Sequence, residues 1–229
     1  MGDLAENLLE ELECETVFSF DIGSFHVDVL ESVVVSWIII AFVFLLSVFL
    51  TSNLKVKNVS RRQLVAETIV VKLQNFVTDM VGEEGKAYVP YLCTVLIYIG
   101  LANTIGLFGM KAPTKDLNVT AALALMSIIL IEAAGLRKKG PKKFIKSFAE
   151  PVAVVTPINI LELFIRPLSL CMRLFGNVLG AFVIMEMLKL IIPVALPVPF
   201  SFYFDIFDGL IQAYVFVFLT ALFIKEAIE

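Results

Sequence analysis

Runs of about twenty mostly apolar residues recur along this 229-residue chain, and they constrain its fold more than any other feature. A helix of about 20 such residues crosses the hydrocarbon core of a bilayer. Hydrophobic residues make up 59% of the chain, whereas about half is usual for soluble domains. The runs cover residues 29–50, 88–109, 119–136, 151–193 and 202–224. The expected fold class is therefore all-α, a polytopic membrane protein with about five membrane helices.

The fourth run, residues 151–193, is longer than one perpendicular crossing requires. We therefore expect a strongly tilted or bent helix there. Pro167 is a candidate kink within it, because proline removes a helical hydrogen bond.

Residues 61–85, between the first two runs, have the pattern of an amphipathic helix. Its apolar face would contain Ile69, Leu73, Phe76, Val77 and Met80. Two arrangements fit this pattern equally: a helix lying on the cytoplasmic membrane surface, and a packed cytoplasmic helix.

The distribution of Lys and Arg predicts the orientation of the chain in the membrane. Residues 1–28 contain neither, and residues 52–87 contain six. The next loop, "MKAPTKDLN", has two, and "LRKKGPKKFIKS" has six again. Since basic loops stay in the cytoplasm, the N-terminus is expected outside and the C-terminus inside.

Two of the apolar runs carry polar residues at helical spacing. In the fourth run they recur at i, i+4, i+7, i+11 and i+15: Glu162, Arg166, Ser169, Arg173 and Asn177, followed by Gly180. The last run has polar residues at the same spacing: Ser201, Asp205, Asp208 and Gln212. Two matched stripes indicate a water-accessible path rather than scattered polar residues.

The predicted orientation sorts these groups by depth. Towards the outer side we expect Glu186, Asp205 and Asp208. Towards the inner side we expect Glu162, Arg166 and Ser169, with Arg173, Asn177 and Gln212 in between. The pattern therefore predicts two half-paths separated by an arginine.

Structural alternatives exist for the charged residues. Arg173 could be a static ion-pair partner, although ionisable groups inside membranes are costly and usually functional. Arg166 fits equally well as a side chain that extends to the cytoplasmic surface. Lys189 is expected to be an anchor, and Tyr214 a packing residue.

No cofactor or metal ion is expected. "GEEGKA" has neither the spacing nor the Ser/Thr of a phosphate-binding loop. The three cysteines, Cys14, Cys93 and Cys171, are unpatterned, and the last two are expected as small buried residues. The acidic N-terminus lacks the basic residues of a signal or transit peptide, which favours a bacterial plasma membrane, although an organelle-encoded chain would lack them too.

Three segments resemble subunit a of the F-type ATP synthase: "RPLSLCMRLFGN", "LIQAYVFVFLTALFI" and "PTKDLNVTAALAL". The resemblance covers nearly the whole chain. It implies one N-terminal span, a cytoplasmic helix, a helical hairpin, and two long tilted helices facing a ring of c subunits. The corresponding division is an outer segment 1–28, a span 29–50, an amphipathic helix 61–85, a hairpin 88–136 and a tilted pair 148–229.

By this resemblance, Arg173 corresponds to the arginine that faces the ion-binding carboxylate of the ring. Asn177, Gln212 and Glu162 also match positions of the family's ion path. Phe182 departs from the family, since many relatives carry Glu or His there. Asp205 stands at a position that is often His. We expect Glu186, one helical turn beyond Phe182, to supply the outer proton relay with Asp205 or Asp208.

The implied function is ion translocation, with the proton expected as the ion, through two offset half-channels to and from the c-ring. The chain would couple the ion gradient to ATP synthesis or hydrolysis without binding nucleotide itself. Expected partners are the c-ring, the peripheral-stalk subunit b, indirectly the F1 headpiece, and the lipid bilayer, but no nucleic acid. The alternatives are a stand-alone transporter or channel, and a structural membrane scaffold.

Overall fold

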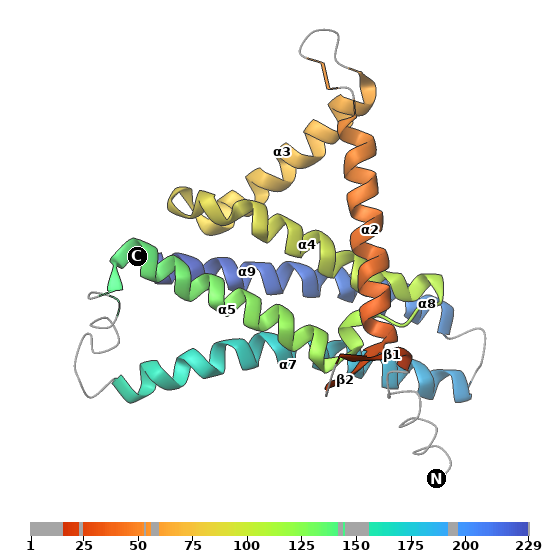
Figure 1. Ribbon diagram of the computed structural model, residues 1–229. Helices are drawn as coiled ribbons and strands as arrows, with labels where there is room; N and C mark the ends of the chain where they lie inside the picture. Colours follow the sequence, from red (N-terminus) through yellow and green to blue (C-terminus); the bar gives the residue numbers. More distant parts are fainter. Residues whose placement is uncertain are drawn as a thin grey trace.

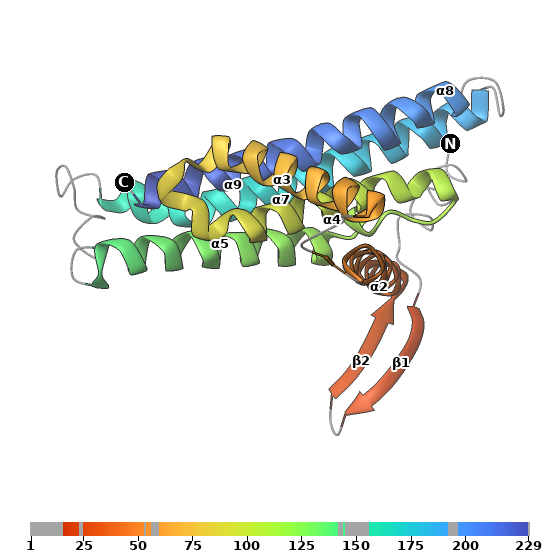
Figure 2. The ribbon, with the colours of Figure 1, turned by 90° about the horizontal axis from the view of Figure 1, so that it is seen from above.

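The computed structural model describes residues 16–22, 25–52, 54–55, 60–141, 144, 156–191 and 197–228. Four helices lie side by side in both views: α4 (Val89–Thr104), α5 (Leu117–Lys139), α7 (Thr156–Ile191) and α9 (Gly209–Ile228) (Figures 1 and 2). Helix α2 (Glu31–Thr51) lies across them, upright in Figure 1 and seen end-on in Figure 2. Cys14 and the predicted start of the fourth run, residues 151–155, lie outside the described residues.

Shorter elements connect and extend these helices. They are the strands β1 (Thr16–Ile22) and β2 (Phe25–Leu30), helix α3 (Arg61–Val81), the 3₁₀-helices η1 (Glu83–Tyr88), η2 (Ile105–Phe108) and η3 (Pro113–Lys115), helix α8 (Pro197–Ser201) and the π-helix η5 (Phe202–Asp208). Within the described residues, five helical stretches are long and apolar enough to cross a membrane: Glu31–Thr51, Glu83–Phe108, Leu117–Lys139, Thr156–Lys189 and Pro199–Ile228. They coincide with the five predicted runs and confirm the all-α, multi-pass class.

Helix α7 is too long to stand upright in a bilayer. Its 36 residues extend for about 54 Å at about 1.5 Å per residue, against a hydrocarbon thickness of about 30 Å. Pro167 lies inside the helix without ending it. α7 and α9 both lie crosswise to α2 in Figure 1. The predicted length of α7 is therefore confirmed, and its tilt in a membrane stays a prediction.

The strands β1 and β2 were not expected from the sequence. They pair antiparallel from Ile22↔Phe25 to Thr16↔Leu30, and Figure 2 shows them projecting away from the helices. Polar and apolar residues alternate in "FHVDVL", which is the period-2 pattern of a strand. His26 contacts Asp21 across the hairpin at 2.5 Å and Asp28 of its own strand at 3.2 Å.

Helix α3 forms where the amphipathic pattern predicts it. The Ser60 hydroxyl accepts a hydrogen bond from the Gln63 amide at its start, and Gly82, with φ of 81°, follows its end. Val77 is buried against the bundle, whereas Ile69 is 57% exposed and Phe76 is 45% exposed. Only part of the predicted apolar face is covered, and the cytoplasmic position of α3 stays a prediction.

The core lies where α4, α5, α7 and α9 meet. Its most buried large side chains include Leu92, Ile99, Ile131, Leu170, Leu174, Val217 and Ile224. Cys93 and Cys171 are free and buried, as expected. Helix α2 contributes few residues to the interior and exposes large apolar side chains such as Phe44 and Phe49. Such a surface suits hydrocarbon, which does not penalise exposed apolar groups as water does.

A buried polar network ties the turn around η3 to three helices. The Asn103 amide of α4 donates to the Gly209 carbonyl (3.1 Å), and the Thr114 hydroxyl donates to Asn103 Oδ1 (2.7 Å). Asp116 accepts from the Asn118 amide at the start of α5 (2.8 Å) and from the Ser32 hydroxyl of α2 (2.5 Å). Fully partnered polar groups of this kind fix helix positions where apolar packing alone is permissive.

Replacing Gly209 with Ala is expected to destabilise the subunit, because the added Cβ would lie 2.8 Å from the Cβ of Asn103. The expected loss in the free energy of unfolding is about 1–3 kcal/mol, as for overpacking elsewhere, measured by denaturant titration in detergent. Gly180→Ala is the matched control, since its added Cβ meets no atom within 4 Å. Equal stability of the two variants would contradict the close approach of α4 and α9.

Candidate functional site

The polar stripe of α7 varies in exposure along its length. Ser169, Arg173 and Asn177 are exposed on one side of the helix, whereas Leu170 and Leu174, which follow Ser169 and Arg173 in the sequence, are buried. We call this side the open face of α7; it comprises Leu168, Ser169, Met172, Arg173, Gly176, Asn177 and Gly180. Arg166 lies at the same helical spacing, but only 13% of its side chain is exposed. The stripe therefore keeps its register, and the Arg166 side chain is covered where those of Ser169, Arg173 and Asn177 are open.

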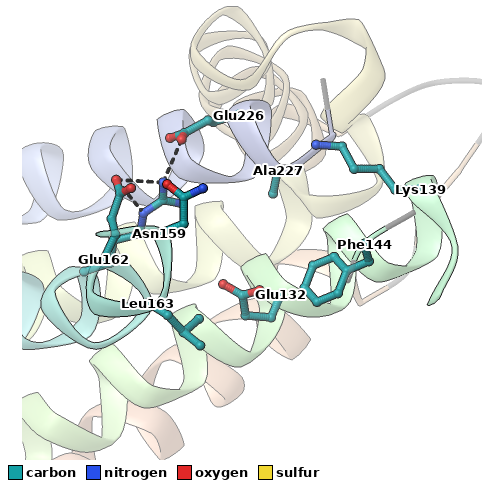
Figure 3. A pocket seen from close by; sticks show the side chains of 9 residues that line it. Glu132, Lys139, Phe144, Asn159, Glu162, Leu163, Glu226 and Ala227 are labelled. Atoms are coloured by element: carbon teal, nitrogen blue, oxygen red, sulfur yellow. Dashed lines mark hydrogen bonds and ion pairs between the residues drawn. The ribbon is translucent and has the colours of Figure 1, made fainter. Parts of the chain in front are cut away.

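Arg166 lies in a cavity of about 200 Å³ between α5, α7 and α9, which we call the Arg166 cavity (Figure 3). Its Nη2 donates to Glu162 (2.9 Å) and to Glu226 of α9 (2.6 Å), and its Nε donates to Glu162 (3.2 Å). The guanidinium also lies 4.9 Å from the centre of the Phe223 ring. Two carboxylates and an aromatic face hold Arg166 in place, so it does not extend freely to the membrane surface.

The Arg166 cavity contains groups that the two polar stripes do not include. Its lining residues are Glu132, Lys139, Phe144, Asn159, Glu162, Leu163, Arg166, Glu226 and Ala227. Glu132 interrupts the apolar run of α5, and an ionisable residue in such a run is itself a signal of function. Glu226 lies 60 residues from Arg166 in the sequence, and no local pattern joins them.

A second cavity, of about 350 Å³, lies between α7, the turn after α4 and the start of the α8–α9 segment; we call it the Asp205 cavity. Its polar lining includes the three predicted outer residues, Glu186, Asp205 and Asp208. Ser201 and Gln212, the latter expected at mid-depth, line it too. Lys189 pairs with Glu186, so it is a cavity residue rather than only an anchor. The Ser201 hydroxyl donates to Asp205 at 2.5 Å.

The Asp205 cavity also contains polar residues that the stripes did not indicate. They are Asn103, Lys111 and Lys115, from the end of α4 and the turn that follows it. Lys115 is only 8% exposed, and its ammonium lies 3.4 Å from the centre of the Phe182 ring, a cation–π contact. Phe182 is the position at which the resemblance predicts Glu or His, and here a buried positive charge covers it.

The stretch that supplies Asp205 and Asp208 is a π-helix, not the regular α-helix assumed from the sequence. π-helical turns are rare and concentrate at functional sites. They change the angular spacing of side chains, yet Ser201, Asp205, Asp208 and Gln212 still line one cavity. The carbonyl of Gly209, the next residue, accepts the Asn103 hydrogen bond that holds this segment against α4.

The two cavities lie towards opposite ends of the α7–α9 pair, and Arg173 lies between them. Arg173 is seven residues, or about 10 Å by helical rise, from Arg166 of the first cavity. It is five residues, or about 8 Å, from Val178 of the second. Arg173 lines neither cavity, and within the described residues it makes no hydrogen bond or ion pair.

The fold and these cavities define a multi-pass membrane protein with separate polar cavities near the two ends of one helix pair. The family model described as "ATP synthase A chain" matches residues 33–225. The chain therefore belongs to the ATP synthase subunit a family. It is an ion-translocating membrane subunit of an ATP synthase and is not itself the catalytic part.

Relatives agree with this assignment. ATP synthase subunit a of Moorella thermoacetica is 37% identical over 73% of this chain and 77% of its own length. A sodium-ion-specific subunit a of Propionigenium modestum is 32% identical, over 73% of this chain and 64% of its own length. Subunit a 2 of a Bradyrhizobium species is 33% identical over 73% of this chain and 75% of its own length.

Proposed function

We propose that this subunit carries protons through two offset half-paths, to and from a rotating ring of c subunits. The observation that carries the proposal is the position of Arg173, exposed and without an ion-pair partner in the described residues, between two separate polar cavities. An unpaired charge on an apolar helix face is costly in a membrane. A carboxylate on a partner helix would supply its counter-charge.

The open face of α7 suits such a partner. Gly176 and Gly180 are exposed and have no atom within 4 Å of an added Cβ. Small residues let the backbones of membrane helices approach closely. Exposed apolar residues of α9, Leu210, Tyr214 and Phe218, add surface suited to hydrocarbon or to a packed helix. We therefore assign the ring to this side, with Asn177 and Ser169 next to Arg173.

Arg173 has the right chemistry for the boundary between the half-paths. A guanidinium stays protonated even when partly desolvated. Its charge favours the ionised form of a nearby ring carboxylate and so promotes release of an arriving proton. The same charge repels a cation that would pass directly from one half-path to the other. Each proton that takes the longer route around the ring carries about 2.3 kcal/mol per 100 mV.

The Asp205 cavity is the outer half-path in this proposal, and the Arg166 cavity is the inner one. The outer path uses Glu186, Asp205, Asp208 and Gln212, and the inner path passes Glu162. The assignment of sides depends on the Lys/Arg distribution, which places the N-terminus outside and the C-terminus in the cytoplasm. We propose a bacterial plasma membrane as the location, with subunit b and, indirectly, the F1 headpiece as further partners.

A proton fits the outer cavity better than a sodium ion does. Its lining mixes the carboxylates of Glu186, Asp205 and Asp208 with the ammonium groups of Lys111, Lys115 and Lys189. A metal cation needs several oxygen ligands arranged around it, and one of the carboxylates, Glu186, is already paired with Lys189. A proton needs only a chain of acceptors and can pass between carboxylates, amines and water by successive transfers.

A stand-alone channel or transporter, or a membrane scaffold, would need none of these partners. Purification of the subunit from its native membrane distinguishes the three. Our proposal requires a c-ring and a nucleotide-binding headpiece to accompany it, and their consistent absence would favour one of the alternatives.

Arg173→Ala should abolish coupling, because the ring carboxylate loses its counter-charge and the half-paths lose their barrier. We expect ATP synthesis driven by a proton gradient in proteoliposomes to fall by at least about a hundredfold. Arg173→Lys should restore little, since a desolvated lysine can lose its proton. Arg137→Ala, at the exposed end of α5, is the control. Normal synthesis by Arg173→Ala would end the proposal.

Glu186→Gln should slow ATP-driven proton pumping, because an amide cannot accept the proton that the outer relay passes on. A loss of about tenfold to a hundredfold is expected, at or below the usual contribution of a positioned acid–base group. Fluorescence quenching of a pH-sensitive dye in the reconstituted vesicles measures the rate. Undiminished pumping would exclude Glu186 from the relay and leave Asp205 and Asp208.

The coupling ion can be tested on the purified complex. If it is a proton, ATP hydrolysis should be unchanged by added Na⁺ at neutral and at alkaline pH. Stimulation by Na⁺ that grows as the pH rises, when protons become scarce, would identify sodium instead.

A further inference from the structure

We propose that Glu132 of α5 is the carboxylate that exchanges protons with the cytoplasm in the inner half-path. This inference depends on the proposed function. It adds a residue that the stripes on α7 and α9 do not contain, because Glu132 enters the Arg166 cavity from a third helix.

The other two carboxylates of the cavity are engaged. Glu162 accepts two hydrogen bonds from Arg166 (2.9 and 3.2 Å), and Glu226 accepts one (2.6 Å). These charge-assisted hydrogen bonds occupy oxygens of both carboxylates. Glu162 and Glu226 therefore join α7 to α9 through Arg166 and form a fixed wall of the cavity.

Glu132 is different. It makes no hydrogen bond or ion pair with any residue that the structure describes, and it is half-buried. Figure 3 shows its carboxylate directed into the space between α5, α7 and α9, near Leu163 and Phe144. Both carboxylate oxygens are thus available to a proton.

The charges around Glu132 suit proton exchange. Arg166 and Glu162 face it from α7, Glu226 faces it from α9, and Lys139 lines the same cavity from α5. Carboxylates outnumber cations in this set, so the cavity attracts cations. Its volume of about 200 Å³ has room for several water molecules of about 30 Å³ each. A proton adds to one oxygen of Glu132 and then passes to a cavity water, which regenerates the carboxylate without any further reactant.

Glu132→Gln in the reconstituted ATP synthase tests the inference. When ATP drives pumping, protons enter through the inner half-path, and a carboxylate collects them best when they are scarce. We expect about a tenfold loss of pumping at alkaline pH on the ATP-exposed side and little loss at acidic pH, where water supplies protons directly. Glu132→Asp should keep the normal pH profile at a reduced rate. Glu84→Gln, which removes an acid paired with Lys138 outside the cavity, should change neither.

Two results would overturn the inference: normal pumping by Glu132→Gln at alkaline pH, or a loss that is equal at every pH, as a purely structural role would give. If Glu132→Gln does not assemble, Glu132→Asp decides, since a flat or displaced pH profile in that variant contradicts the inference. The outcome for Arg173→Ala is separate. Lost coupling in Arg173→Ala beside an unaffected Glu132→Gln would remove this inference and leave the proposed function intact.

Discussion

The free-energy cost of a charge inside an apolar bundle is the constraint on which the rest of this structure depends. Ion pairs offset this cost for two of the charged residues. Arg166 pairs with Glu162 and Glu226, and Glu186 pairs with Lys189. These pairs line cavities, because polar groups that cannot all be bonded internally need water. Arg173 has no ion-pair partner among the described residues and lines neither cavity. Charged residues at both ends of the α7–α9 pair thus have partners within the chain. Arg173, between them, is available to a partner subunit.

The length of α7 makes this arrangement possible. The residues of α7 that line the two cavities extend from Asn159 to Lys189, farther along the chain than an ordinary span of about 20 residues. The 36 residues of α7 include them all. The buried Leu170 and Leu174 fix the rotation that leaves Arg173 exposed. The separation of the cavities and the exposure of the arginine are consequences of one helix.

Periodicity along single segments predicted much of this, and contacts between segments account for what it missed. The five spans, the length of α7 and the gathering of Asp205, Asp208 and Gln212 follow from patterns within single segments. Glu226 and Asn103 have no such signal, because their partners lie 60 and 106 residues away. Helical spacing also does not predict that the Arg166 side chain is covered, since its bond to Glu226 joins two distant segments. The strands β1 and β2 carry a short period-2 pattern that the search for apolar runs passed over.

The Asp205 cavity contains both acidic and basic side chains, and Lys115 is a buried positive charge in its lining. The apolar ring of Phe182 stands where the resemblance predicts a titratable group, and the buried ammonium of Lys115 lies against that ring. A cation that is removed from water needs favourable contacts in place of its lost hydration, and it also needs negative charge nearby. The ring face supplies part of the first, and the carboxylates of Glu186, Asp205 and Asp208 line the same cavity. The π-helix and the turn that carries Lys115 therefore bring opposite charges into one cavity from different segments of the chain, which leaves it polar although the apolar ring of Phe182 is part of its lining.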